Sequence, residues 1–264
     1  MKPSDLKSIV REKYGKIAAG SGNEKESCSC TPGCCTPEGY TVFSEDYSRL
    51  PGYNSDADLS LGCGIPVEYA SLRQGDHLLD LGSGAGNDCF VARALVGENG
   101  HVTGIDFTEE MLAKAEENRQ KLGYSNIEFV KGDIEEMPLP DNSYDVVVSN
   151  CVLNLVPDKQ KAFSEIMRVL KPGGHFCVSD VVIRGTLSES ARADAELYAG
   201  CVAGASTLDE YLEFIQGNGF ADIMIHKEKR IEMPDVTVSG AAGETGSGIY
   251  SITVSASKPL PPDR

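Results

Sequence analysis

Hydrophobic and polar residues follow two periods along this chain, one helical and one extended. The apolar residues within residues 5–18 recur at helical spacing, which predicts an amphipathic helix; they are Leu6, Ile9, Val10, Tyr14 and Ile17. Residues 20–37 are rich in Gly, Ser and Cys and predict a loop. Between residues 39 and 66 the pattern is weak, because prolines and glycines interrupt any regular element.

From residue 77 onward, short apolar runs alternate with amphipathic segments. The runs predict strands at residues 77–81, 101–105, 127–131, 144–149 and 175–183. The segments between them predict helices at residues 88–95, 108–122 and 158–170; Thr108 is the expected N-cap of the second, and Pro172-Gly173-Gly174 should stop the third. Further on we expect a helix at residues 208–216 and strands at residues 223–231 and 249–255. This alternation predicts an α/β fold, a doubly wound and mostly parallel sheet covered by helices on both faces.

Charge and hydropathy exclude several classes of function. The formal net charge is −16 with no run of Lys and Arg, so a phosphate backbone would be repelled and we expect no nucleic-acid partner. No apolar stretch is long enough to span a bilayer, and the polar N-terminus is not a secretory signal, so we expect no membrane partner and a cytoplasmic protein. There its nine cysteines would stay largely as thiols, and an odd number argues against a disulfide framework.

A glycine-rich turn follows the first strand of the alternation. The segment Asp80-Leu81-Gly82-Ser83-Gly84-Ala85-Gly86 ends a strand and opens a helix, and its glycines let the backbone turn sharply and approach a ligand closely. Asp106 ends the next strand, 20 residues after Gly86, where an acidic residue can accept hydrogen bonds from ribose hydroxyls. Gly132-Asp133-Ile134 follows the third strand. Because ligands of open α/β sheets bind at the carboxyl ends of the strands, these segments predict a nucleotide site, although a dinucleotide dehydrogenase would offer a similar turn.

Taken together, four motifs resemble those of the class I S-adenosylmethionine-dependent methyltransferases. They are Asp80-Leu81-Gly82-x-Gly84-x-Gly86, Gly104-Ile105-Asp106, Gly132-Asp133-Ile134-Glu135 and Arg168-Val169-Leu170-Lys171-Pro172-Gly173-Gly174, and the resemblance covers residues 72–182. It implies S-adenosyl-L-methionine as the cofactor and a Rossmann-like sheet of seven strands, the last inserted antiparallel. It also implies the cofactor contacts. Asp80 and the glycine turn (Gly82, Ser83, Gly84 and Gly86) approach the methionine part, Asp106 holds the ribose, Asp133 and Ile134 hold the adenine, and Phe107 and Asn150 are further cofactor-binding residues.

Three cysteines stand near the rim of the sheet where this cofactor would bind. Cys63 lies just before the nucleotide-binding segment, Cys151 directly after the fourth strand, and Cys201 beyond the fifth, each in a loop or Gly-rich context. Cysteine also behaves as a small buried hydrophobe, and we assign that packing role to Cys89 and Cys177, which fall within a predicted helix and strand. A thiol directly after the fourth strand faces the expected position of the cofactor's methyl group and is poorly explained as a core filler.

Three thiolates suit a soft metalloid. They can bind trivalent arsenic as a trigonal pyramid, whose lone pair can attack the sulfonium methyl in line. Arsenic carries no proton to remove, so this reaction needs no general base. The positions of the four histidines are consistent with a reaction that uses no general base. His77, His101 and His175 lie at the starts of strands, far from the cofactor, and His226 lies in a late strand.

The cysteine motifs then resemble the arsenite methyltransferase family in its prokaryotic form. The motifs are Leu61-Gly62-Cys63-Gly64-x-Pro66, Ser149-Asn150-Cys151-Val152-x-Asn154-Leu155 and Gly200-Cys201-Val202-x-Gly204-Ala205, and the likeness runs over residues 34–220. It implies that Cys63, Cys151 and Cys201 bind the arsenic, delivered as thiol adducts. It also implies that Cys35 or Cys34, with a preference for Cys35, pairs with Cys63 in a redox cycle that uses thioredoxin or glutathione as reductant. The chain departs from the family pattern at Ile65, where Asn is expected, and at Asn87, where a larger residue is common.

The domain organisation follows from these motifs, and the 264 residues suit one large domain with short additions. We expect residues 1–66 to form an N-terminal helix and cysteine-rich loop region, residues 67–185 the cofactor-binding Rossmann-like domain, and residues 186–264 the arsenic-site and C-terminal region.

Two other functions stay open on the sequence. A methyltransferase acting on a quinone or an amine would share the nucleotide domain but would tolerate Ser at Cys151 and Cys201. A thiol-based metalloid-binding protein would bind arsenite without consuming the cofactor. The loop Cys28-x-Cys30-x-x-x-Cys34-Cys35 could also bind zinc or capture arsenic first, although it lacks the paired C-x-x-C of structural zinc sites.

Overall fold

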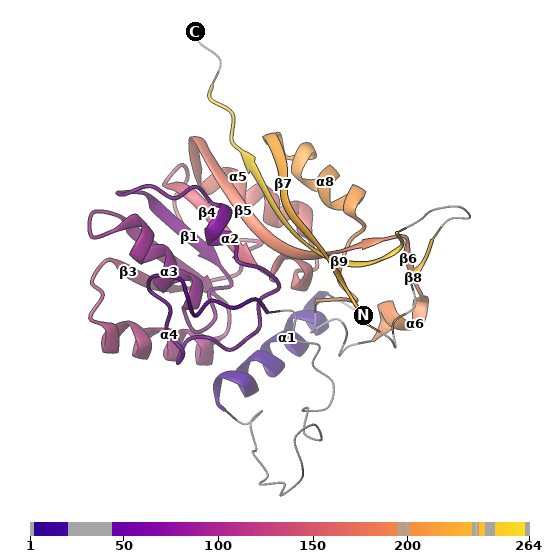
Figure 1. Cartoon of the computed structure of the whole chain (residues 1–264), viewed down its shortest axis with the longest axis horizontal. Helices are drawn as coiled ribbons and strands as arrows, with labels where there is room; N and C mark the ends of the chain where they lie inside the picture. The colour runs from indigo at the N-terminus through magenta and orange to yellow at the C-terminus, as the bar shows by residue number, and fades with distance from the viewer. Residues whose placement is uncertain are drawn as a thin grey trace, which may run out of the picture.

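The computed structural model describes residues 3–20, 44–194, 197, 201–233, 236, 238–240 and 246–261. Among these residues the centre is a seven-stranded sheet in the order β3-β2-β1-β4-β5-β9-β7 (Figure 1). The strands are β1 (His77–Leu81), β2 (His101–Asp106), β3 (Ile127–Lys131), β4 (Tyr144–Asn150), β5 (Leu170–Arg184), β7 (Ala221–Ile231) and β9 (Gly248–Ser257). The first five pair in parallel, and β9 lies antiparallel between β5 and β7. The predicted α/β fold, with seven strands and the last inserted antiparallel, is confirmed.

Alternate residues of the central strands pack into two different cores. In β1, Leu78 packs into the core that contains α3 (Asn87–Val96), whereas Leu79 packs into the core that contains α5 (Lys159–Val169) and α8 (Leu208–Gly217). Both leucines are buried. A strand covered on both faces needs apolar residues at every position, which is why these strands read as continuous apolar runs in the sequence. Near the edge of the sheet that lies opposite β7, α4 (Glu109–Leu122) packs against β2 and β3.

The N-terminal helix and several short elements complete the fold. As predicted, a helix forms near the N-terminus: α1 (Pro3–Ala18) packs against α4 and against η1 (Leu153–Leu155), the single turn after β4 (Figure 1). The weak pattern before residue 66 did not predict α2 (Pro66–Tyr69), whose first residue is a proline with a backbone angle suited to a helix start. Two short strands, β6 (Thr186–Leu187) and β8 (Val238–Ser239), pair with each other, and α6 (Glu189–Ala193) follows β6.

The junction between α5 and β5 differs from the sequence prediction. The helix ends at Val169, and Pro172-Gly173-Gly174 lies inside β5 rather than after the helix. The backbone N–H of Gly173 donates to the carbonyl of Lys258 at 2.9 Å, and that of Lys258 donates to the carbonyl of Gly174 at 2.8 Å. The segment is therefore paired with a part of the chain that lies far away in sequence, and Gly173 adopts φ of 80°, which glycine tolerates.

Different groups form hydrogen bonds at the N-terminal ends of α4 and α5. Thr108 stands at the N-cap of α4 as predicted, but its hydroxyl makes no capping hydrogen bond. Instead the backbone N–H of Thr108 donates to Asp106 Oδ1 at 2.8 Å. In α5 the side chain of Asp158 accepts a hydrogen bond from the backbone of Lys161 at 2.9 Å, so the helix begins one residue later than predicted, at Lys159.

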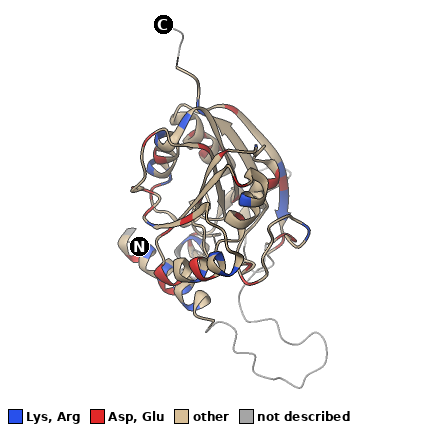
Figure 2. Cartoon of the chain, turned by 90° about the vertical axis from the view of Figure 1, so that its left-hand side faces the viewer, with Lys and Arg blue, Asp and Glu red and all other residues tan. Residues whose placement is uncertain are grey.

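Charged side chains of both signs are spread over the helices and the edge of the sheet (Figure 2). A basic stretch in β7 is paired with carboxylates: Lys227 with Glu45 at 2.6 Å and Arg230 with Glu232 at 3.3 Å. These two positive charges of β7 are therefore paired with carboxylates. Within the described residues, no helix is both long and apolar enough to cross a membrane.

Candidate active site

A cavity lies at the carboxyl ends of β1, β2 and β4, with α1 forming part of its wall. The structure brings nearly all of the predicted cofactor-binding residues into this wall: Asp80, Gly82, Ser83, Gly84, Asp106, Phe107, Asp133, Ile134 and Asn150. Gly86 does not line the cavity. A Cβ there would lie about 3.0 Å from the rings of Phe90 and Phe129, so this glycine serves the packing of α3 under the turn.

The glycine turn is held against the end of β2 by backbone hydrogen bonds. The N–H groups of Gly82 and Ser83 both donate to the carbonyl of Ile105, at 2.8 and 3.0 Å. Gly82 and Gly84 have φ of 66° and 52°, and a Cβ on Gly82 would come within 2.5 Å of the Val152 side chain. Glycine is required at Gly82 both for this backbone angle and for space, and the bare backbone of the turn faces the cavity.

Two buried carboxylates frame the turn. Asp106 Oδ2 accepts from the backbone N–H of Gly84 at 3.0 Å, and burial outweighs such hydrogen bonds to raise the pKa of Asp106. Burial, reinforced by the charge of Asp88, raises the pKa of Asp80 well above its ordinary value. The thiol of Cys89 donates to Asp80 Oδ2 at 3.2 Å, so Cys89 supports this carboxyl as well as packing in the core.

Two polar atoms in the wall have no hydrogen-bond partner among the described residues. They are Ser83 Oγ and Asn87 Oδ1, both buried. A buried polar atom without a partner is destabilising, so each is suited to bind a polar group of a ligand. The amino and carboxylate groups of a methionine moiety supply both donors and acceptors, and the residues present therefore fit S-adenosylmethionine. In the sequence, Asn87 was noted only as a departure from the family pattern. Its position at the start of the helix after the glycine turn could have indicated that it lines the cavity.

The loop that carries Cys63 is fixed to the end of β4 by Asn150. The Asn150 side chain accepts from the backbone N–H of Cys63 at 3.0 Å and donates to the carbonyl of Gly64 at 2.9 Å. A Cβ on Gly62 would lie 2.5 Å from the Asn150 amide, so the loop can approach this closely only with glycine there. The hydroxyl of Tyr47 donates to Asp88 Oδ1 at 2.7 Å and accepts from Asn150 at 2.8 Å, which completes a network that the sequence did not reveal.

The three predicted arsenic-binding thiols lie together in one buried cluster. Cys63, Cys151 and Cys201 are 1%, 4% and 3% exposed. The Cys151 thiol contacts the other two thiols, and these contacts together with burial raise the pKa of Cys151 well above its ordinary value. Burial also raises the pKa of Cys63. Cys63 and Cys151 are therefore protonated near neutral pH before any ligand binds.

The backbone holds two of these cysteines in an unusual conformation. Cys151 and Cys201 have φ of 61° and 67°, in the left-handed region that residues with a Cβ rarely adopt. The Cys201 thiol donates to the carbonyl of Cys151 at 2.9 Å. Within the described residues no three His, Cys, Asp or Glu side chains are set out to hold a metal ion, so the thiols must turn from these mutual contacts to share one ligand.

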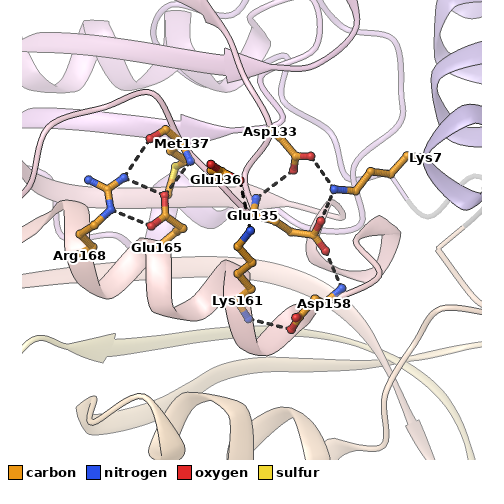
Figure 3. Close-up of polar contacts among 9 residues, drawn as sticks. All are labelled: Lys7, Asp133, Glu135, Glu136, Met137, Asp158, Lys161, Glu165 and Arg168. Atoms are coloured by element: carbon orange, nitrogen blue, oxygen red, sulfur yellow. Dashed lines mark hydrogen bonds and ion pairs between the residues drawn. The ribbon is translucent and has the colours of Figure 1, made fainter. Parts of the chain in front are cut away.

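Three residues of α1 also line the cavity, which the sequence did not predict. They are Lys7, Val10 and Tyr14. The ammonium group of Lys7 forms ion pairs with Asp133, at 2.5 Å, and with Glu135, and Figure 3 shows it reaching between the two carboxylates. Tyr14 places a polar hydroxyl on the apolar face of the predicted helix, and this was the only feature of the sequence that could have indicated a role in the cavity. No feature of the neighbouring sequence distinguished Lys7.

The remaining predicted positions fall elsewhere. Cys34 and Cys35, with Cys28 and Cys30, lie outside the described residues. Cys177 is buried in the core beside α3, as predicted. None of the four histidines, all of which the structure describes, lines the cavity.

Comparison with known proteins gives a consistent result. A model of the methyltransferase domain family matches residues 72–219, more than half of the chain. The arsenite methyltransferase of Halobacterium salinarum is 40% identical over 99% of this chain and 68% of its own length. That of Aquipseudomonas alcaligenes is 34% identical over 92% of this chain and 70% of its own length. The crystal structure of an arsenic(III) S-adenosylmethionine methyltransferase from Chlamydomonas reinhardtii superposes with a TM-score of 0.65 and 38% identity, over 77% of this chain and 69% of that one.

Proposed function

This chain belongs to the arsenite methyltransferase family, and we propose that it transfers the methyl group of S-adenosylmethionine to trivalent arsenic bound by the thiolates of Cys63, Cys151 and Cys201. One observation carries the thiolate proposal. Cys151 lies in the wall of the cavity lined by the glycine turn and Asp106, and its thiol contacts the thiols of the other two cysteines.

The cofactor supplies an electrophilic methyl group on a positively charged sulfur. In the proposed arrangement the turn from Gly82 to Gly84 holds the methionine part, and Ser83 Oγ and Asn87 Oδ1 gain the partners they lack. Asp106, which lines the cavity, would hold the ribose, and Asp133 with Ile134 would hold the adenine. With the cofactor held in this way, its methyl group would be supplied to the part of the cavity at the end of β4, where Cys151 lines the wall.

Arsenic binding needs no separate base. Three thiols react with arsenous acid to form three arsenic–sulfur bonds, and each thiol proton leaves with a hydroxide as water. With a thiol adduct of arsenic, each proton leaves with the departing thiolate instead. The raised pKa values of Cys63 and Cys151 suit this exchange, because the proton needed by each leaving group is still on the sulfur.

Methyl transfer then uses the lone pair of arsenic. An arsenic–carbon bond forms while the carbon–sulfur bond of the cofactor breaks, and arsenic is oxidised from the trivalent to the pentavalent state. Its return to the trivalent state needs two electrons. We propose that the thiolate of Cys35, or of Cys34, attacks the arsenic-bound sulfur of Cys63, so that a disulfide forms and arsenic is reduced. A thiol reductant such as thioredoxin or glutathione then restores both thiols.

The proposed domain division fits this chemistry. Residues 1–66 contribute Cys63 and the wall residues of α1, residues 67–185 contribute the cofactor-binding residues and Cys151, and residues 186–264 contribute Cys201. The site would form only where the three regions meet, since each supplies one thiol.

The test is a methylation assay with purified protein, S-adenosylmethionine, arsenite and a thiol reductant, in which arsenic products are identified by mass. We expect wild type to produce methylated arsenicals and Cys151→Ser to produce none. Cys177→Ser is the matched control, because Cys177 is an equally buried thiol in the core away from the cavity. Full activity of Cys151→Ser would refute the three-thiolate site. Tight arsenite binding without product would favour a metalloid-binding protein, and neither binding nor product would favour an organic methyl acceptor.

A further inference from the structure

One helix connects the two ends of the cavity. Lys7, Val10 and Tyr14 of α1 all line the cavity, and their spacing of three and four residues places them on one face of the helix. Seven residues of α-helix extend about 10 Å along the axis. The helix can therefore contact the adenine end with Lys7 and the thiol end with Tyr14 at the same time.

The Lys7 end is anchored by charge. Its ammonium group pairs with Asp133, at 2.5 Å, and with Glu135 (Figure 3). Burial alone would lower the pKa of Lys7, but the two carboxylates raise it, so this lysine stays charged. Glu135 also accepts from the backbone N–H of Asp158 at 2.6 Å, which ties the anchor to the start of α5.

The Tyr14 end reaches the thiol cluster. Tyr14 packs against the buried cluster that contains Cys63, Cys151 and Cys201, and it lines the cavity together with Cys151 and Asp106. Its hydroxyl is hydrogen-bonded to the Cys201 thiol. Burial of the hydroxyl, followed by the nearby thiols, raises the pKa of Tyr14 well above its ordinary value. Because the Cys201 thiol already donates its proton to the carbonyl of Cys151, the Tyr14 hydroxyl is the donor and the sulfur is the acceptor.

Arsenic binding changes what holds Cys201. Its thiol now donates to the carbonyl of Cys151 at 2.9 Å, and that hydrogen bond is lost when the sulfur gives up its proton to bind arsenic. A hydrogen bond from Tyr14 to the sulfur does not depend on the thiol proton, because the sulfur is the acceptor. It also strengthens as the sulfur gains negative charge.

We propose that Tyr14 is a positioning residue of the methylation reaction: it directs the sulfur of Cys201 toward arsenic, from a helix that Lys7 fixes across the cofactor cavity. This inference rests on the proposed role of Cys201 as an arsenic ligand. It assigns α1 to the active site, with one end serving the cofactor and the other the arsenic.

The first test compares Tyr14→Phe with Tyr124→Phe, which removes the same hydroxyl from a tyrosine packed on Phe90 outside the cavity. Calorimetry without cofactor gives the affinity for arsenite, and steady-state kinetics gives both KM values. We expect Tyr14→Phe to weaken arsenite binding and raise its KM about tenfold, the effect of losing one hydrogen bond to a charged group. The affinity for S-adenosylmethionine, measured without arsenite, should be unchanged. Tyr124→Phe should match wild type.

The second test asks whether Lys7 acts through Tyr14. Lys7→Gln should weaken arsenite binding severalfold although Lys7 contacts no thiol, whereas Lys16→Gln, an exposed lysine of the same helix, should not. In the Tyr14→Phe background, Lys7→Gln should add no further loss, because the interaction it supports is already absent. Wild-type arsenite affinity and KM in Tyr14→Phe would overturn the inference while leaving the three-thiolate proposal intact. Arsenite binding by Cys201→Ser with wild-type affinity would overturn both.

Discussion

The three thiols are not equivalent once arsenic carries a methyl group. Methylarsenite has two remaining sites for sulfur, so two thiolates suffice to hold it. Cys151 contacts both other thiols, so contact alone does not rank them. In the proposed reduction step the sulfur of Cys63 leaves the arsenic as a disulfide, so methylarsenite stays on Cys151 and Cys201, and Cys63 is the dispensable ligand. We expect Cys63→Ser to lose methylation of arsenite but to keep methylation of methylarsenite, and Cys201→Ser to lose both.

Supplying the two arsenicals separately and identifying the products by mass distinguishes these variants. Cys177→Ser again controls for the loss of a buried thiol. Methylation of arsenite by Cys63→Ser at the wild-type rate would show that Cys63 is not a ligand in the first step.

The buried carboxyl of Asp180, in β5, should make the stability of the protein depend on pH. Asp180 is 1% exposed and accepts from the Tyr211 hydroxyl at 3.1 Å, and burial raises its pKa to about 7. Between about pH 4 and 7 the folded protein therefore binds more protons at this carboxyl than the unfolded chain does, and the free energy of unfolding falls as the pH rises. The full loss has an upper bound of roughly 4 kcal/mol, from a shift of about three pKa units.

Asp180→Asn should remove this contribution to the pH dependence. Urea unfolding of wild type and variant at several pH values between 4 and 8 measures it, and the variant should show the flatter profile. Burial raises the pKa of Asp88 to about 6, so Asp88 also makes the free energy of unfolding fall as the pH rises. This contribution is the same in wild type and variant, and the difference between their profiles therefore reports Asp180 alone. Parallel profiles would contradict the expectation.

At the scale of elements, the pattern of apolar residues predicted the sheet and its helices because their signals are local. The exceptions involve distant partners. Pro172-Gly173-Gly174 belongs to a strand because Lys258 pairs with it, and α1 belongs to the active site because Lys7 meets Asp133, 126 residues away. Periodicity predicted that α1 forms but could not predict where it packs.

The short loop around Cys63 provides a test at the scale of elements. A Cβ on Gly64 would lie 2.5 Å from Ser179 Oγ and 2.7 Å from Ser179 Cβ, so Gly64→Ala must push the loop away from β5. We expect destabilisation of about 1–3 kcal/mol by urea unfolding, as for other overpacked cores, together with reduced arsenite methylation because Cys63 moves. Gly217→Ala is the control, since nothing lies within 4 Å of a Cβ there. Equal free energies of unfolding for the two variants would mean that the loop can move away from β5 without loss of stability.

At the scale of the whole molecule, the site is assembled from segments that are far apart in sequence. Most residues of the cavity wall at the strand ends could be predicted, because they follow the rule that ligands bind at the carboxyl ends of parallel strands. Chemistry suggested the convergence of Cys63, Cys151 and Cys201, and the buried cluster is consistent with it. The contributions of Tyr14 and Tyr47 could not be predicted, because they depend on how the N-terminal region packs over the sheet.

This packing leads to a final prediction, that the cofactor and arsenic bind with positive coupling. If α1 closes over both ligands, the first ligand to bind orders the helix for the second, and by linkage each raises the affinity for the other by the same factor. S-adenosylhomocysteine is the suitable probe, because it occupies the cofactor site without transferring a methyl group. We expect it to tighten arsenite binding by about fivefold or more in wild type, a typical coupling between sites. Lys7→Gln should lose this enhancement, because the helix is no longer fixed to Asp133 and Glu135, while Lys16→Gln should keep it. Calorimetric titration of arsenite with and without S-adenosylhomocysteine measures the factor directly. Equal affinities in wild type would show that the two ends of α1 act independently, and the helix would then be a fixed wall of the cavity rather than a link between its two ligands.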